Sequence, residues 1–256
     1  MTTGDELLLL ALRPGRRRIR IRAEDRLRFA LRASELADLG RAGRIAIGPR
    51  RIEVRDSRQV EDRRLNNVLR SLGATAPPPS LKDWLRRTPR SLTTEYLSRL
   101  EDQKAVRVRR WRDPSGRARH DILSVDLPRR RALLARLDNV IRSGPAASTA
   151  DGNLTLAVLV QAAGLASAAY PGLRGIADRR RLAALATAHR LDPTADEELA
   201  AALTTGADAL TRRVLDELSD LYADFTTGGH GLGHDLNSGS WSEGGTGHHG
   251  GGHGGW

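Results

Sequence analysis

DELLLLALRPGRRRIRIRAEDRLRFALRASELADLGRAGRIAIGPRRIEV, residues 5–54, decides the fold because its hydrophobic period changes several times within a short length. The aliphatic run Glu6–Leu12 predicts one or two turns of helix, which Pro14 and Gly15 end. Arg16–Arg22 then alternates arginine with isoleucine, the period of a strand with one buried and one basic face. The opening therefore predicts a short helix followed by a basic strand.

A longer helix is predicted over Glu24–Leu39, where leucine, phenylalanine and alanine recur at helical spacing. Gly40 and Gly43 supply the stop that commonly follows a helix. Isoleucine and valine then flank a Gly-Pro turn, so Ile45–Val54 predicts a β-hairpin.

The remaining chain up to residue 227 is predicted to be mostly helical. Further segments have helical spacing or alanine and leucine composition: Gln59–Leu72, a capped helix opening at Ser80, Ser91–Asp102, Pro128–Arg142, Asn153–Tyr170, Ile176–Leu191, and Asp196–Phe225 with a break near Thr204–Gly206. A second hairpin is predicted between Val106 and Val125, directly after a helix, which is a winged-helix-like arrangement. We predict a mainly α fold, a single helical domain over residues 1–227 with this winged-helix-like portion and peripheral β-hairpins.

Residues 228–256 form a low-complexity tail rich in glycine and histidine. Ordering glycine costs much backbone entropy, and this segment has little apolar surface to offset that cost, so we predict a disordered tail. Histidines on a flexible chain would permit binding of divalent metals, but a solubilising role is the favoured interpretation.

The net charge of +11 indicates an anionic partner if the charge is functional. Arginine supplies nearly all of the 42 basic residues, since Lys82 and Lys104 are the only lysines. The planar guanidinium suits phosphate because it binds two oxygens at once. Mutational bias in a GC-rich genome explains the arginine content equally well, so composition alone does not identify the partner.

Cysteine is absent, which excludes disulfides, thiolate nucleophiles and thiolate metal sites from this sequence. The first residues lack the basic start and cleavage pattern of a signal peptide. Leu154–Tyr170 is the longest other apolar stretch, and it falls short of the ~20 residues that cross a bilayer. We therefore expect a cytoplasmic protein whose membrane attachment, if any, is peripheral.

Motifs of catalysis are missing from the body of the chain, which has only His120 and His189 as histidines. No phosphate-binding loop, nucleophile elbow, HExxH helix or dinucleotide fingerprint occurs there. We predict a binding protein and not an enzyme, with no cofactor and no metal centre.

Several motifs in a fixed order carry a resemblance to a known family. They are the opening ELLLLAL, the block ALRASELADLGRAGRI, the connector and helix at Pro79–Trp84, the arginine-bearing helix before the hairpin, and the helix NLTLAVLVQAAGL. In this order they resemble the Golgi phosphoprotein 3 family of phosphoinositide-binding peripheral membrane proteins. The resemblance extends from Glu6 to about Phe225.

This resemblance implies that a basic face docks on membranes and holds the headgroup of phosphatidylinositol 4-phosphate. The family pocket uses an arginine of the first helical block, two arginines on the helix before the hairpin, and an upstream tryptophan. Arg32 matches the first of these positions and Arg90 matches one of the second pair. The other two positions hold Thr93 and Ala23, which puts headgroup specificity in doubt. Nearby cations that would compensate are Arg22, Arg86 and Arg87.

The resemblance also implies roles for the hairpin and for partner proteins. The family hairpin contributes to self-association and membrane contact, so a homo-oligomer through the region near Trp111 is expected. Trp111 itself is predicted to pack between the hairpin and the core, with an interfacial anchor as the alternative. Family members also connect lipids to the cytoplasmic tails of membrane enzymes, which permits an adaptor role.

Nucleic-acid binding through the winged-helix-like portion is the alternative function. Six arginines would make a basic wing that binds phosphate backbone: Arg107, Arg109, Arg110, Arg112, Arg117 and Arg119. The helix before them offers only Arg99 as a cation, against three acidic residues. Recognition of bases in a groove is therefore disfavoured.

Overall fold

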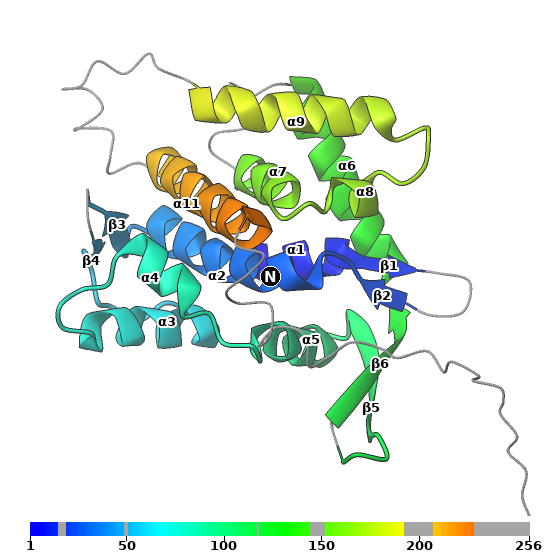
Figure 1. Cartoon of the computed structure of the whole chain (residues 1–256), viewed down its shortest axis with the longest axis horizontal. Helices are drawn as coiled ribbons and strands as arrows, with labels where there is room; N and C mark the ends of the chain where they lie inside the picture. The colour runs from blue at the N-terminus through cyan, green and yellow to red at the C-terminus, as the bar shows by residue number, and fades with distance from the viewer. Residues whose placement is uncertain (15–18, 49–50, 117, 144–151, 192–206, 228–256) are drawn as a thin grey trace, which may run out of the picture. The chain divides into compact units, whose positions relative to one another are not determined.

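Helix α1, Thr3–Ala11, is enclosed by other helices in the computed structural model (Figure 1). The structure describes residues 1–14, 19–48, 51–116, 118–143, 152–191 and 207–227. The four leucines of α1, Leu7 to Leu10, are fully buried, as expected for a helix that is apolar on every side. Thr2 and Asp5 cap its start with reciprocal hydrogen bonds, so the helix begins earlier than the predicted Glu6.

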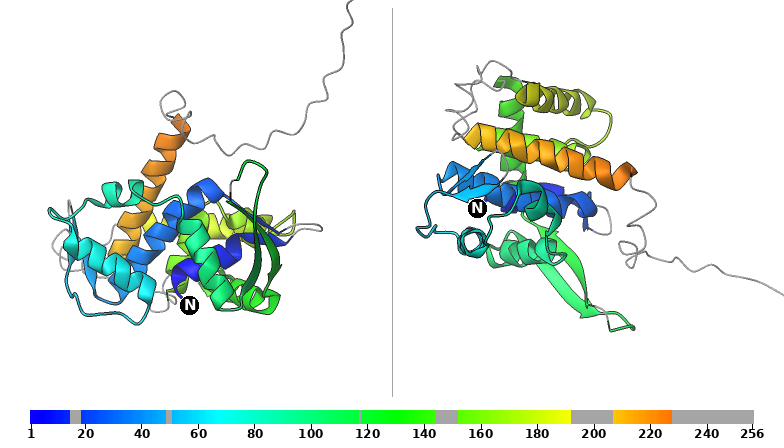
Figure 2. Two further views of the ribbon diagram at one scale, coloured as in Figure 1. Left: turned by 90° about the horizontal axis from the view of Figure 1, so that it is seen from below. Right: turned by 60° about the vertical axis from the view of Figure 1, so that its left-hand side comes forward.

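Helix α2, Glu24–Arg41, packs along α1 and lies between two groups of helices. One group comprises α3 (Arg63–Ala74), α4 (Leu81–Arg86) and α5 (Leu92–Asp102). On the other side lie α7 (Asn153–Ala162), α9 (Ile176–Leu191) and α11 (Ala207–Thr227). Helices α6 (Leu127–Ser143) and α8 (Ala166–Ala169) contact α1. The right-hand view of Figure 2 shows the same order, with α2 in blue between α11 in orange and α5 in green.

Four strands form one antiparallel sheet in the order β1-β2-β6-β5. Their bounds are β1 Leu12–Pro14, β2 Ile19–Ile21, β5 Val106–Arg112 and β6 Ala118–Val125. Ile19 pairs with Ile122, which joins the arginine-rich strand near the amino terminus to the later hairpin. A separate two-stranded sheet holds β3 (Ile45–Ile47) and β4 (Ile52–Val54).

The predicted mainly α fold with β-hairpins is confirmed, and several boundaries differ for local reasons. The helix predicted over Asn153–Tyr170 is divided into α7 and α8 because Gly164 adopts φ of +70°. The helix predicted from Gln59 begins only at Arg63, since the Asp62 carboxylate caps its first turn. The predicted segment 196–206 and the tail 228–256 lie outside the described residues.

Residues 1–222 form one compact unit, and residues 223–256 form a second one. The unit boundary falls within α11, five residues before the predicted end of the helical domain at residue 227. Only residues 223–227 of the second unit are described. The core of the first unit centres on α1 and the buried face of α2.

Candidate anion-binding site

Arg32 lies in the middle of α2, with only 9% of its surface exposed. Its Nη1 donates a hydrogen bond of 2.9 Å to Glu35 Oε2. Its guanidinium carbon lies 3.8 Å from the centroid of the Trp84 ring, and Trp84 is on α4. Arg32 Nε is buried and has no hydrogen-bond partner among the described residues. The residue predicted to contact a ligand is thus held from two sides by the protein.

Glu35 is the centre of a buried ionic network. It is fully buried, and besides Arg32 it accepts a hydrogen bond of 2.6 Å from Arg64 Nε and one of 3.4 Å from the Tyr96 hydroxyl. Arg64 also pairs with Glu95. Burial lowers the pKa of Arg32, and the Glu35 carboxylate opposes that change. Arginine keeps its proton in such a setting, so Arg32 remains a cation whose charge is shared with Glu35.

Arg90 is exposed in the turn between α4 and α5. Arg28 lies on α2 four residues before Arg32, so both side chains lie on the same face of the helix. Burial lowers the pKa of Arg28, and the positive charge of Arg90 nearby lowers it further. The structure therefore brings Arg90 close to Arg28 and places Arg32 one turn along. We call Arg28, Arg32 and Arg90 the arginine cluster.

The two positions that depart from the family pattern have structural roles. Ala23 is the N-cap of α2 and has a left-handed backbone with φ of 50°. Thr93 is buried in the first turn of α5. Trp84, not residue 23, supplies the aromatic ring beside Arg32. Sequence reasoning missed both Trp84 and Arg28 as site residues, although the spacing of four residues between Arg28 and Arg32 is a readable signal.

The three predicted compensating cations are exposed. Arg22 precedes α2 and donates its backbone N–H to the Ala11 carbonyl. Arg86 and Arg87 lie at the end of α4, on the same short segment as Trp84. This segment packs against α2, so these two cations add positive charge beside the arginine cluster.

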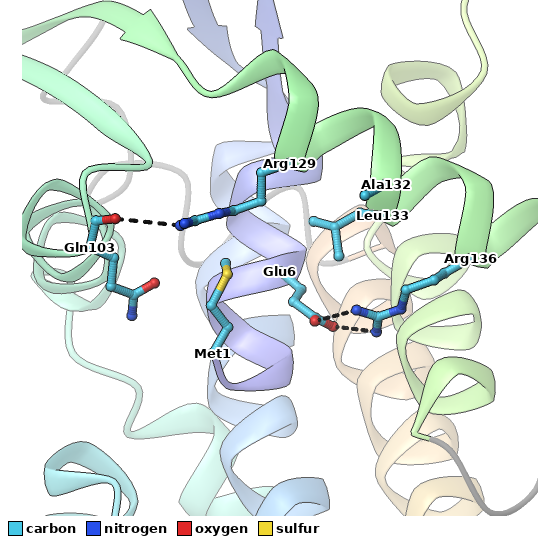
Figure 3. Close-up of a pocket in the computed structure, with 7 residues that line it drawn as sticks. All are labelled: Met1, Glu6, Gln103, Arg129, Ala132, Leu133 and Arg136. Carbon is cyan, nitrogen blue, oxygen red and sulfur yellow. Dashed lines mark hydrogen bonds and ion pairs between the residues drawn. The ribbon is translucent and has the colours of Figure 1, made fainter.

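A hollow of about 550 Å³ lies elsewhere and contains none of the arginine cluster (Figure 3). It is lined by Met1, Glu6, Gln103, Arg129, Ala132, Leu133 and Arg136. Arg136 donates two hydrogen bonds, of 2.7 and 3.0 Å, to the Glu6 carboxylate. Arg129 reaches the Gln103 carbonyl at 3.4 Å. The cations of this hollow are committed to protein acceptors, so it is the weaker candidate for an anionic ligand.

Trp111 is 44% exposed, so the prediction that it packs between the hairpin and the core is wrong. Its neighbour Arg110 hydrogen bonds to Glu101 and Ser98 on α5. Side chains alternate across a strand, and Trp111 therefore points to the face of β5 that is away from α5.

Several of the cations proposed for nucleic-acid binding are paired with acids, and Arg117 lies outside the described residues. Arg99 donates two hydrogen bonds of 3.0 Å to Asp5 and also binds Asp62, so the one cation of the candidate reading helix is engaged. Arg109 pairs with Asp121 and Arg119 with Asp113. This pairing reduces the field that the hairpin presents to a phosphate backbone.

Across the described residues, no helix combines the length and the apolar character needed to cross a bilayer. The fold is that of a mainly α protein, and the arginine cluster groups two cations of α2 with one from the turn after α4. Residues 4–209 match the family model of Golgi phosphoprotein 3 (GPP34), and the chain belongs to this family, whose members associate with membranes. A comparison with curated proteins gave no match.

Proposed function

We propose that this protein is a peripheral membrane protein that binds a phosphoinositide headgroup, specifically that of phosphatidylinositol 4-phosphate, through Arg32 and Arg90. The observation that carries the proposal is the position of Arg32 on α2 and of Arg90 in the turn after α4, a helix that packs against α2, in a chain of this family. The proposal assigns binding and no catalytic step. It also assigns a cytoplasmic protein that attaches to the surface of anionic membranes.

Charge supports the proposal. Arg86 and Arg87 lie on the segment that packs against α2, and they would attract an anionic surface before the headgroup is bound. Each hydrogen bond from a guanidinium to a phosphate is worth about 1.5 to 3 kcal/mol. Loss of one such contact would therefore weaken binding about tenfold or more.

Sedimentation with vesicles tests the proposal. Vesicles with phosphatidylinositol 4-phosphate are compared with phosphatidylserine vesicles of equal charge, using wild-type protein, Arg90→Ala and Arg32→Gln. Arg90 is exposed, so its truncation spares the core, whereas glutamine at position 32 retains a donor for Glu35. We expect preference for the phosphoinositide in the wild-type protein and its loss in both variants.

Arg180→Ala is the matched control for charge. Arg180 is exposed on α9, which lies on the other side of α2 from α4 (Figure 1). This variant removes the same charge and is expected to keep the preference. Equal binding to both kinds of vesicle by the wild-type protein would refute the proposal and leave only general attraction. Binding of duplex DNA without any vesicle binding would favour the nucleic-acid alternative.

A further inference from the structure

Arg28 belongs to the arginine cluster but takes no part in the buried ionic network around Glu35. Its side chain is half-buried on α2, and its guanidinium carbon lies 4.5 Å from the centroid of the Phe29 ring. Its Nε is buried without a hydrogen-bond partner among the described residues. Arg32, by contrast, donates to Glu35 and stacks on Trp84.

An unpartnered guanidinium nitrogen in a half-buried position is costly for the folded protein. A buried donor without an acceptor loses its hydrogen bonds to water and gains none in return. The nearby charge of Arg90 adds repulsion, and the acid that acts on Arg28 is Asp25, which is exposed at the start of α2. An anion bound between Arg28 and Arg90 would remove both costs.

The chemistry of that anion follows from the donors. A phosphate monoester carries a charge of about −1.5 to −2 at neutral pH and three acceptor oxygens. Two guanidinium groups that approach from different elements match such an acceptor better than they match a carboxylate, which has two oxygens. The contact with the Phe29 ring restricts the Arg28 side chain, which reduces the entropy lost on binding.

We infer that Arg28 binds the phosphate monoester of the ligand directly, together with Arg90, and supplies the cation that the family pattern expects at Thr93. This inference rests on the proposed function for the source of the monoester, a lipid headgroup. Arg32 then acts mainly as a positioning residue, since Glu35 and Trp84 hold it one turn away on the same face of α2. The proposed ligand thus meets Arg28, whose Nε has no hydrogen-bond partner among the described residues, together with Arg90 and with an Arg32 whose charge is shared with Glu35.

Three variants of α2 test the inference. Arg28→Ala removes the proposed contact, and Arg26→Ala removes the same charge two residues away, on the opposite side of the helix. Arg28→Lys retains the charge and the apolar stem over Phe29 but not the guanidinium fork. Circular dichroism and thermal unfolding confirm that each variant is folded before binding is measured.

Two binding measurements separate a lipid source from a soluble source of the monoester. Vesicle sedimentation compares phosphatidylinositol 4-phosphate with phosphatidylserine at equal charge, and calorimetry measures inositol 1,4-bisphosphate in solution. We expect Arg28→Ala to weaken phosphoinositide-dependent binding about tenfold or more. Arg28→Lys should fall between Arg28→Ala and the wild-type protein, and Arg26→Ala should behave as the wild type.

The possible failures are distinguishable. If the wild-type protein prefers the phosphoinositide and Arg28→Ala binds as Arg26→Ala does, the inference is overturned and the proposed function stands. If the wild-type protein shows no preference among vesicles but binds the soluble bisphosphate, and Arg28→Ala loses that binding, the inference stands with a soluble ligand and the proposed function fails. Absence of both kinds of binding in the wild-type protein overturns both.

Discussion

Trp84 lies beneath the guanidinium of Arg32, with 3.8 Å between the ring centroid and the guanidinium carbon. The ring comes from α4 and the cation from α2, so the contact joins the two elements that border the arginine cluster. Trp84 is 6% exposed, and this burial shields the interaction from water. The aromatic partner expected near position 23 is thus provided from a different part of the chain.

The first prediction concerns Trp84. Trp84→Leu should lower the free energy of unfolding by about 2 to 4 kcal/mol, because it removes a buried ring and a desolvated cation–π contact. Trp84→Phe should cost less, since it keeps an aromatic face and the indole Nε1 makes no hydrogen bond among the described residues. Urea denaturation measures the free energy of unfolding of both variants. Equal stability of the Leu and Phe variants would show that the stacking contributes nothing.

Glu35 is the subject of the second prediction. Glu35→Gln leaves Arg32 and Arg64 in the core without their shared carboxylate, which should lower the free energy of unfolding by about 3 to 5 kcal/mol. Glu95→Gln is the matched control, because Glu95 also pairs with Arg64 but its side chain is 42% exposed. The control should cost no more than about 1 kcal/mol. Similar denaturation midpoints for the two variants would contradict the central role of Glu35.

Much of the fold was predictable because the spacing of apolar residues along the chain indicates helices and strands locally. The spacing of apolar residues placed α9 at its observed bounds, and the start of α2 at Glu24, without any tertiary information. The pairing of Ile19 with Ile122 was not predictable in this way, since it depends on how the core brings distant strands together. Local patterns therefore identified the hairpins β3–β4 and β5–β6, but not the sheet in which β2 pairs with β6.

The candidate site was predictable only in part, for a related reason. Arg32 has the sequence signature of an exposed basic residue on an amphipathic helix, yet Trp84 and Glu35 bury it. The contact with Glu35 lies within α2 at a spacing of three residues, whereas the contact with Trp84 depends on the packing of α4 against α2, which the sequence does not encode at a fixed spacing. Arg28 was accessible to sequence reasoning, because residues four apart on a helix share a face.

The third prediction is an acid dependence of stability that originates at Asp5. Burial by itself would raise the pKa of this carboxyl, but hydrogen bonds from Arg99, Thr2 and Gln103 bring it below the ordinary value of 3.8. As the pH falls, the unfolded chain takes up this proton before the folded protein does. The stabilisation is therefore complete above the unfolded pKa and is lost as the pH falls through the folded pKa. We expect Asp5→Asn to be less stable near neutral pH and to show a shallower loss of stability as the pH falls from about 5 through the folded pKa.

Asp38 should change the pH dependence of stability in the opposite direction to Asp5. Burial raises its pKa above 3.8, although hydrogen bonds from Thr3 and the charge of Arg41 oppose that change. The folded state therefore binds this proton more readily, and protonation of Asp38 favours folding as the pH falls. Asp38→Asn should make the acid loss of stability steeper than in the wild-type protein. Parallel pH profiles for the Asp5 and Asp38 variants would contradict these assignments.

The fourth prediction uses the exposure of Trp111 to separate a packing role from an interface role. Trp111 pairs with Arg119 on the face of β5 away from α5, and 44% of its surface is exposed. Trp111→Ser should therefore change the free energy of unfolding by no more than about 0.5 kcal/mol, the usual effect of a surface substitution. Val106→Ser, at the buried start of the same strand, is the matched control and should destabilise strongly.

Self-association then provides the second measurement on the same variant. If copies of the chain associate through this hairpin, burial of an exposed tryptophan would stabilise the contact, because large aromatic residues dominate interface energetics. Analytical ultracentrifugation should show a concentration-dependent increase in sedimentation coefficient for the wild-type protein and a smaller increase for Trp111→Ser. An unchanged increase would place any interface elsewhere, whereas a large loss of stability in Trp111→Ser would return this side chain to a packing role.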